Sequence, residues 1–373
     1  MLSRPRPTPV PEHELRWIER VRALLPAFAA TVADDDRDAR LPVEHLAALA
    51  DAGVDAAFLP VEHGGEGLSY ATLGQIVRML AATHPALATV WLMHLGAAHG
   101  LVTMSQPEQA AFFAAELRAG KRFANALSEP AGGNLFLASQ LDVPAIDGGW
   151  SLTGRKVFVS GSEIADHLLL SARVDGMPAF FGVSADPQTV SFPPIDETMG
   201  MRATRSRTIV FEGTPLLAER RCGMPPADYA NLITVGFGFI SIGIAEAALT
   251  SLSASANKRK PGATAALADE QWVKMETGLA WAEWRAATLL AEQVAWLADQ
   301  RNPAAMATAT ESKMLANEVA KKCAALALRI GGGGAYLTAS PIQRIFRDAQ
   351  AGALMAYSVP FSQQLVGEQV LAS

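Results

Sequence analysis

The order of its hydrophobic periodicities is the feature that most constrains this chain. Through about the first 120 residues, apolar side chains recur at three- and four-residue steps, as in Leu15, Ile18, Val21, Leu25 and Phe28. Such spacing is typical of helices with one buried face. From residue 121 to about 225 the segments shorten and β-forming residues collect, and from 226 to 373 long Ala-rich helical patterns return. Helices, strands and helices in separate blocks predict an α+β fold rather than an alternating, doubly wound sheet.

Within the first block, which we assign as a helical domain over residues 1–120, several residues mark element ends. Gly53 follows the periodic run 43–50 and is expected to end that helix. The segment 59–67 is rich in turn formers and predicts a loop. Ser69 can cap a following helix that runs towards His84.

The second block, residues 121–225, predicts a small β domain. Candidate strands are rich in Val, Ile, Leu and aromatic residues and cover 150–152, 156–159, 167–170, 180–183 and 208–211. We expect Asp147-Gly148-Gly149 and Glu212-Gly213 to form turns between strands.

The third block, residues 226–373, predicts a helical domain with breaks at Pro261-Gly262 and at 331–334. Its stretch 233–252 is long and apolar enough to suggest a membrane span. It also contains Glu246 and several glycines and has no basic residues before it, so a buried helix in a bundle is the better interpretation.

Composition excludes several classes of function. Half of the residues are hydrophobic, which fits a globular protein with a large core. Lys and Arg form no long block and the formal net charge is −6, so we expect no nucleic-acid partner. Cys222 and Cys323 lack any C-x-x-C spacing and the histidines are scattered, so we expect neither a disulfide framework nor a metal site. No signal-like apolar run follows Met1, and a cytoplasmic location is expected, without membrane insertion.

Five segments in order carry a resemblance. They are Leu-Pro-Val-Glu-His-Gly-Gly-Glu-Gly at 59–67, Ala-Leu-Ser-Glu-Pro-Ala-Gly-Gly at 126–133, Gly-Arg-Lys-Val-Phe-Val-Ser at 154–160, Met-Gly-Met-Arg-Ala-Thr-Arg-Ser at 199–206, and Arg-Ile-Gly-Gly-Gly at 329–333 leading to Arg-Ile-Phe-Arg-Asp-Ala at 344–349. Together they resemble the acyl-CoA dehydrogenase superfamily. This resemblance implies a central β barrel between an N-terminal helical domain and a C-terminal four-helix bundle. It also implies a homodimer or homotetramer with FAD in a cleft.

The resemblance implies roles for four residues of the β domain. Leu127 and Ser128 would meet the pyrimidine side of FAD, Phe158 would pack on its ring system, and Ser160 would donate a hydrogen bond near N5. Flavin needs such partners and such a platform. From the pattern alone, Phe158 would instead be a core strand residue and the serines turn residues.

Three further FAD-contacting residues implied by the resemblance belong to the third block, residues 226–373. Arg259 would reach the FAD pyrophosphate of the partner subunit, a role that suits the forked donors of a guanidinium. The family's aromatic residue three positions later is Gly262 here. Gly332 and Gly333 would let the backbone approach the FAD tail of another subunit. Read without the resemblance, Arg259 belongs to a solvated cluster and the glycines end a helix.

The catalytic base is where the sequence departs from the family. Dehydrogenation of an acyl thioester needs a carboxylate that removes the α-proton while hydride leaves the β-carbon. In most members a Glu stands eight residues after the Asp of Arg-Asp-Ala, which gives Ala356 here, and the alternative position falls near Ile233. Asp228 and Glu246 are the nearest acidic candidates, although a structural role is the commoner one for such residues.

Three hypotheses follow. The one we favour is an FAD-dependent dehydrogenase that introduces an α,β double bond into an acyl thioester, CoA-bound or carrier-bound, and passes electrons to an electron-transfer partner. The second is a flavin-dependent monooxygenase on the same fold, served by a flavin reductase and needing no α-proton base. The third is a non-catalytic flavin-binding partner subunit of a heteromeric dehydrogenase.

Overall fold

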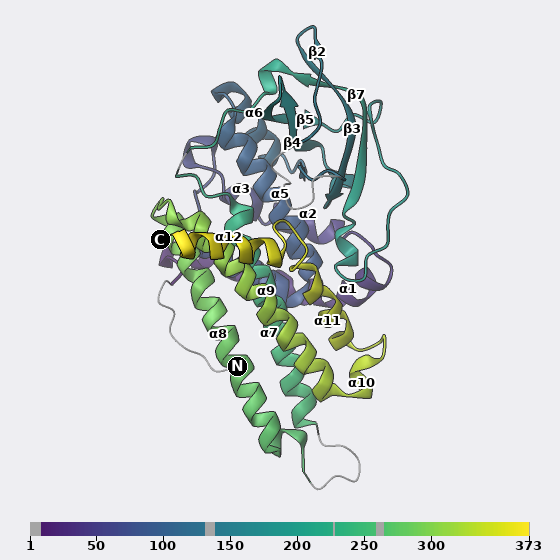
Figure 1. The fold of residues 1–373 in the computed structure, drawn as a ribbon, viewed down its shortest axis with the longest axis vertical. Helices are drawn as coiled ribbons and strands as arrows, with labels where there is room; N and C mark the ends of the chain where they lie inside the picture. The colour runs from purple at the N-terminus through teal and green to yellow at the C-terminus, as the bar shows by residue number, and fades with distance from the viewer. Residues whose placement is uncertain (1–8, 131–138, 227, 259–264, 373) are drawn as a thin grey trace.

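A computed structural model describes residues 9–130, 139–226, 228–258 and 265–372. The sheets lie at one end of the molecule and the long C-terminal helices extend away from them at the other (Figure 1). The N-terminal helices lie between and beside these two parts. This arrangement confirms the α+β fold with helical, sheet and helical parts in chain order.

The N-terminal block consists of helices, as predicted. They are α1 (Leu15–Arg37), α2 (Val43–Asp51), α3 (Val54–Ala57), α4 (Tyr70–Thr83), α5 (Pro85–Met104) and α6 (Pro107–Arg118). The stripe of α1 buries Ile18, Val21 and Phe28. Gly53 follows α2 with φ 76°, a left-handed conformation that glycine adopts without strain. Ser69 caps α4 by accepting a hydrogen bond from the Thr72 amide.

The middle block forms two sheets around one apolar core. Their strands are β1 (Phe123–Ala126), β2 (Ala145–Ile146), β3 (Gly149–Val159), β4 (His167–Val174), β5 (Met177–Ser184), β6 (Val190–Ser191) and β7 (Arg207–Leu217). One sheet has the order β1-β4-β5, with β1 parallel to β4, and the other has the order β2-β3-β7-β6. The predicted barrel is thus built from two facing sheets.

The predicted turn at Glu212-Gly213 is wrong. These residues lie inside β7, where the pairing with β3 shifts register between Leu152 and Gly154. Gly213 has φ 68° and donates its amide to the Thr153 hydroxyl over 3.0 Å. A β-bulge and a turn use the same left-handed glycine, so the local sequence does not distinguish them.

The C-terminal block is a bundle of long helices with shorter ones packed beside it. They are α7 (Leu232–Asn257), α8 (Gln271–Asp299), α9 (Ala304–Gly331), α10 (Gly333–Tyr336), α11 (Pro341–Ala351) and α12 (Val359–Ala372). The predicted break at 331–334 is confirmed by Gly332, which ends α9 with φ 61°. The other predicted break, Pro261-Gly262, lies outside the described residues.

Helix α7 is the buried apolar helix that the sequence predicts. Helices α5 and α7 are long and apolar enough to cross a membrane, but 78% and 72% of their apolar windows are buried inside the protein. A Cβ added at Gly243 of α7 would lie 2.5 Å from the carbonyl oxygen of Arg78 in α4. Glycine therefore lets the two helices touch backbone to backbone.

Candidate functional site

Phe158, at the end of β3, is the most unusual residue of the β domain. Its backbone has φ 56°, a conformation that costs free energy for a residue other than glycine. The pairing of β3 with β7 also changes register between Lys156 and Val159. Its ring is 73% exposed. A strained backbone that presents a large aromatic ring to solvent is typical of a ligand platform.

A chain of hydroxyl groups lies beside this platform. The Ser160 oxygen is 2.7 Å from that of Ser206, which is 2.9 Å from that of Thr204. Thr204 donates its only hydroxyl proton to the Met201 carbonyl over 2.9 Å. Because a hydroxyl carries one proton, Ser206 must donate to Thr204 and Ser160 to Ser206. Ser160 is thereby left with free lone pairs, and donating to a ligand would require its bond to Ser206 to break.

A buried ion pair supports the segment before the platform. Lys156 is completely buried, and its Nζ donates to Glu129 over 2.6 Å, to the Leu127 carbonyl over 3.3 Å and to Ser171 over 3.1 Å. Burial alone would raise the pKa of Glu129, but hydrogen bonds, the largest from Lys156, hold that pKa below its ordinary value. Lys156 thus fixes the backbone at Leu127 by a hydrogen bond from the interior of the domain.

Four of the predicted FAD-binding residues are close to one another in the fold. The Val157 amide donates to the Ser128 carbonyl over 2.9 Å, which joins the Leu127–Ser128 segment to β3 directly beside Phe158. Ser160 follows two residues later and is almost buried. The sequence motifs identified these segments but not the Lys156–Glu129 pair. Opposite charges within two neighbouring motifs were the signal for it.

Gly332 and Gly333, also predicted to contact FAD, lie elsewhere in the fold. Arg259 is outside the described residues. Gly332 and Gly333 lie where α9 ends and α10 begins, at the far side of the bundle from the sheets (Figure 1). A Cβ added at either glycine would meet nothing within 4 Å, so this chain leaves that backbone open to approach. Within one chain they do not join Phe158.

The acidic candidates for the base are both held in ion pairs. Asp228 lies before α7 and accepts a hydrogen bond from Arg301 over 2.6 Å, which lowers the pKa of its carboxyl group. Glu246, inside α7, pairs with Arg78 over 2.6 Å. Ala356 lies in the α11–α12 turn (residues 352–358) with φ 53° and offers no group that could take a proton.

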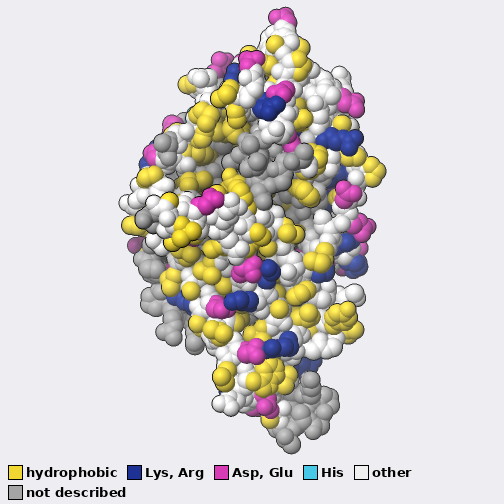
Figure 2. Space-filling view, viewed as in Figure 1, with side chains coloured by type: hydrophobic (Ala, Val, Ile, Leu, Met, Phe, Trp, Pro, Cys, Tyr) yellow, Lys and Arg dark blue, Asp and Glu magenta, His cyan; other side chains and the backbone are white. Residues whose placement is uncertain are grey.

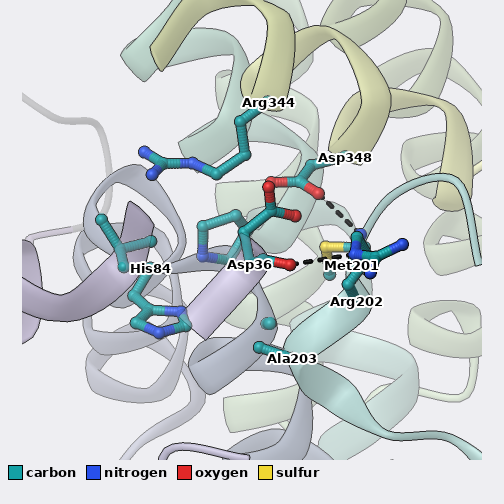
Figure 3. Close-up of a pocket in the computed structure, with 10 residues that line it drawn as sticks. Asp36, His84, Met201, Arg202, Ala203, Arg344 and Asp348 are labelled. Atoms are coloured by element: carbon teal, nitrogen blue, oxygen red, sulfur yellow. Dashed lines mark hydrogen bonds between the residues drawn. The ribbon is translucent and has the colours of Figure 1, made fainter. Parts of the chain in front are cut away.

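A small pocket between α1, α11 and the 199–205 segment adds a further connection (Figure 3). Asp348 accepts a hydrogen bond from the Met201 amide over 2.6 Å, and burial raises the pKa of Asp348 to about 6. Arg347 pairs with Asp36 of α1. The empty space is about 190 Å³ including open solvent. This is smaller than the pockets that enclose drug-sized ligands, and FAD is larger than such ligands. The pocket therefore joins two motif segments rather than holding the flavin.

Half-buried His99 and buried Lys313 are polar groups that the sequence motifs did not single out. His99 of α5 stacks on Tyr229, with ring centroids 5.7 Å apart and Nδ1 3.2 Å from the phenol oxygen. Lys313 of α9 is 6% exposed and faces the α11–α12 turn. A polar side chain inside an apolar helix pattern was the signal for both. Among the described residues, no three His, Cys, Asp or Glu side chains are grouped to hold a metal.

Comparison with protein families covers all three parts of the chain. The acyl-CoA dehydrogenase N-terminal domain matches residues 11–121, the middle domain residues 124–214 and the C-terminal domain residues 235–356. The chain belongs to the acyl-CoA dehydrogenase family. It is accordingly a flavoprotein oxidoreductase of the acyl-CoA dehydrogenase type.

Individual relatives agree with this assignment. The putative acyl-CoA dehydrogenase YdbM of Bacillus subtilis is 27% identical and covers 91% of this chain and 93% of its own. Butyryl-CoA dehydrogenase from Megasphaera elsdenii superposes with a TM-score of 0.90 at 20% identity, over 97% of this chain and 99% of its own. FMN-bound TdsC, a dibenzothiophene monooxygenase from Paenibacillus sp. A11-2, gives 0.84 at 21% identity, over 96% and 97%.

Proposed function

We propose that this acyl-CoA dehydrogenase family member uses FAD to introduce a double bond between the α- and β-carbons of an acyl thioester. The observation that carries the proposal is Phe158, whose exposed ring and strained backbone offer a platform beside Leu127, Ser128 and Ser160. FAD, when bound, supplies the hydride acceptor for such a reaction.

The residues around the platform fit a flavin ring. Phe158 provides a flat apolar face, and the Leu127–Ser128 backbone provides an edge that Lys156 holds rigid. Ser160 lies two residues beyond Phe158 and would donate to the ring once its proton turns away from Ser206. These residues would orient the ring and exclude water from one side of it.

FAD rather than FMN is the cofactor that we propose, because Arg259, Gly332 and Gly333 would serve the adenosine and pyrophosphate end of the dinucleotide. The two glycines stand at the junction of α9 and α10, and α10 lies away from β3, the strand that carries Phe158 (Figure 1). They would therefore act on the FAD of a neighbouring subunit, which requires a homodimer or a homotetramer.

The proposed reaction also needs a residue that accepts the proton from the α-carbon. Asp228 and Glu246 remain the acidic candidates, and each would have to leave its arginine before it could accept a proton. Asp228→Asn and Glu246→Gln variants test them separately. Loss of product formation with retained FAD binding would identify the base.

Ala356 favours a second candidate, a flavin-dependent monooxygenase, because that chemistry needs no base at this position. The likeness to TdsC, at 21% identity, shows a shared fold and no more. A non-catalytic partner subunit would equally tolerate Ala356.

We propose a cytoplasmic enzyme that passes electrons to an electron-transfer partner, whereas the monooxygenase would receive electrons from a flavin reductase.

Product analysis tests the proposed reaction. The FAD-loaded protein is incubated with a panel of saturated acyl-CoAs and a soluble electron-accepting dye, and the thioesters are then examined by mass spectrometry. The dehydrogenase predicts a product that has lost two hydrogens. Appearance of an oxygen-containing product, only when oxygen and a flavin reductase are added, would favour the monooxygenase instead.

A further inference from the structure

Lys313 of α9 is a buried cation whose described hydrogen-bond partners belong to one turn. Its side chain is 6% exposed. Its Nζ donates to the Tyr357 carbonyl over 2.7 Å and to the Gly352 carbonyl over 3.1 Å. These two carbonyls stand at the two ends of the α11–α12 turn and flank Ala356.

A second side chain of α9 reaches the same turn. Asn317, one helical turn after Lys313, donates its amide to the Gly352 carbonyl over 2.7 Å and accepts a hydrogen bond from Ser241 of α7 over 2.5 Å. A Cβ added at Gly352 would lie 2.6 Å from the Asn317 amide oxygen. Glycine thus lets the turn pack directly on this pair of side chains.

No described carboxylate pairs with Lys313. The nearest ring is that of Phe237 in α7, whose centroid is 6.0 Å from Nζ. Burial lowers the pKa of Lys313 to about 8. An uncompensated ammonium is costly to bury, and an apolar side chain of similar length would fill the same space without that cost. What the ammonium adds is charge-assisted hydrogen bonds to the turn.

The turn is connected to the platform. Helix α11 ends one helical turn after Asp348, which bonds the Met201 amide, and the Met201 carbonyl accepts the last proton of the Ser160–Ser206–Thr204 chain. Ala356 is held at φ 53°, a conformation that persists only where surrounding contacts impose it.

We propose that Lys313 is a positioning residue that holds the α11–α12 turn, and the backbone groups on either side of Ala356, in place at the flavin site. It acts through the Gly352 and Tyr357 carbonyls and does not touch the reacting atoms. The assignment of the turn to the active site rests on the proposed function. Loss of the proton from Lys313 would weaken both bonds and loosen the turn.

Other charged groups lie on the elements packed around Lys313, and several of them have partners of their own. They are Glu246 of α7, paired with Arg78; Glu283 of α8, paired with Lys322, and the buried Glu292 of α8; Arg344, Arg347 and Asp348 of α11; Tyr357 of the turn; Glu368 of α12, bonded to Gln364; and Glu311 and Glu318 of α9, the latter paired with Lys321. Burial raises the pKa of Tyr357, so its phenol stays neutral where Lys313 titrates.

Hydrogen–deuterium exchange of the intact protein, from pH 6.5 to 9.5 and corrected for the intrinsic rate, tests the proposal without any activity. In the wild type, we expect protection of the turn amides to fall about tenfold or more as the pH passes about 8. A Lys313→Met variant should show the low protection at every pH. Lys322→Met, which removes an exposed lysine of the same helix paired with Glu283, should behave as the wild type.

A further variant separates charge from packing. Asn317→Leu removes the neutral anchor of Gly352 and should lower protection while keeping the step near pH 8, so the test survives if Lys313→Met does not fold. A wild-type turn with unchanged protection up to pH 9.5 would overturn the proposal, as would full protection in folded Lys313→Met. If the wild type oxidises no thioester but its turn still loses protection near pH 8, the proposed function is wrong and the role of Lys313 stands.

Discussion

At the scale of single residues, the site depends on side chains that contradict their local pattern. Phe158 belongs to a strand by sequence, yet its ring is exposed and its backbone left-handed. Lys156 belongs to the same strand and is completely buried, with Glu129 as its counter-ion. Strain and buried charge both lower the free energy of unfolding, and they are tolerated where binding requires them.

Phe158→Ala should weaken FAD binding by about tenfold, or ~1–2 kcal/mol, because the ring loses one apolar face. Titration of the apoprotein with FAD, followed by flavin fluorescence, measures the change. Phe192→Ala is the matched control, since Phe192 is a partly exposed aromatic of the same domain that packs on Arg207. Equal affinity in both variants would remove Phe158 from the flavin site.

Lys156→Met should lower the free energy of unfolding by about 3–5 kcal/mol, because Glu129 would be left buried without its partner. Urea denaturation with and without FAD measures this loss. Lys121→Met removes the exposed Lys121–Asp166 pair and should cost about 1 kcal/mol or less. A double variant Lys156→Met/Glu129→Leu should recover part of the loss. A loss no greater than that of Lys121→Met would contradict the support role.

At the scale of elements, the sequence predicted the helices well and the strand irregularities poorly. The glycine after α2 and the Ser69 cap are local signals that were confirmed. The periodic stripe of α1 was confirmed at Ile18, Val21 and Phe28, whereas Leu15, at the first turn of the helix, is exposed. The bulge at Gly213 was mistaken for a turn because both need the same backbone conformation. The burial of Lys156 with Glu129 depends on tertiary pairing, at which the opposite charges of the two motifs only hint.

Helix α11 docks on the 199–205 segment through Asp348, whose pKa burial raises to about 6. The native state therefore binds this proton more tightly than the unfolded chain, in which the pKa is near 3.8. Between these two values stability should fall as the pH rises. An Asp348→Asn variant keeps an acceptor for the Met201 amide and lacks this titration.

The difference in unfolding free energy, wild type minus Asp348→Asn, should thus decrease by about 3 kcal/mol between pH 4 and 7, at ~1.4 kcal/mol per pH unit. Urea unfolding of both proteins at several pH values measures it, and other titrating groups cancel in the difference. A difference that stays constant, or rises with pH, would contradict the burial argument.

At the scale of the whole molecule, the helical end carries hydrophobic side chains on its surface (Figure 2). On α8, Trp272, Met275 and Leu279 are 42%, 67% and 63% exposed and recur at helical spacing on one face. Contiguous exposed apolar residues mark an interaction surface. A second copy of this chain is the partner that the proposed sharing of FAD across subunits requires.

Met275→Glu/Leu279→Glu should therefore shift the protein towards monomer and weaken FAD binding together, because charges at an apolar interface are costly. Sedimentation velocity reports the assembly and FAD titration reports the affinity. Glu substitutions at Met177 and Met224, which are exposed on the β domain and just before α7, provide the control. Unchanged sedimentation in the α8 variant would place the interface elsewhere.

The central claim is that this flavoprotein oxidises an acyl thioester although residue 356 is alanine. Anaerobic titration of the FAD-loaded protein with a panel of acyl-CoAs, followed at the visible flavin band, tests it most directly. At least one thioester should bleach the band in proportion to the amount added. No bleaching by any thioester, together with full bleaching by a flavin reductase and NAD(P)H, would contradict it and favour the monooxygenase or the non-catalytic partner subunit.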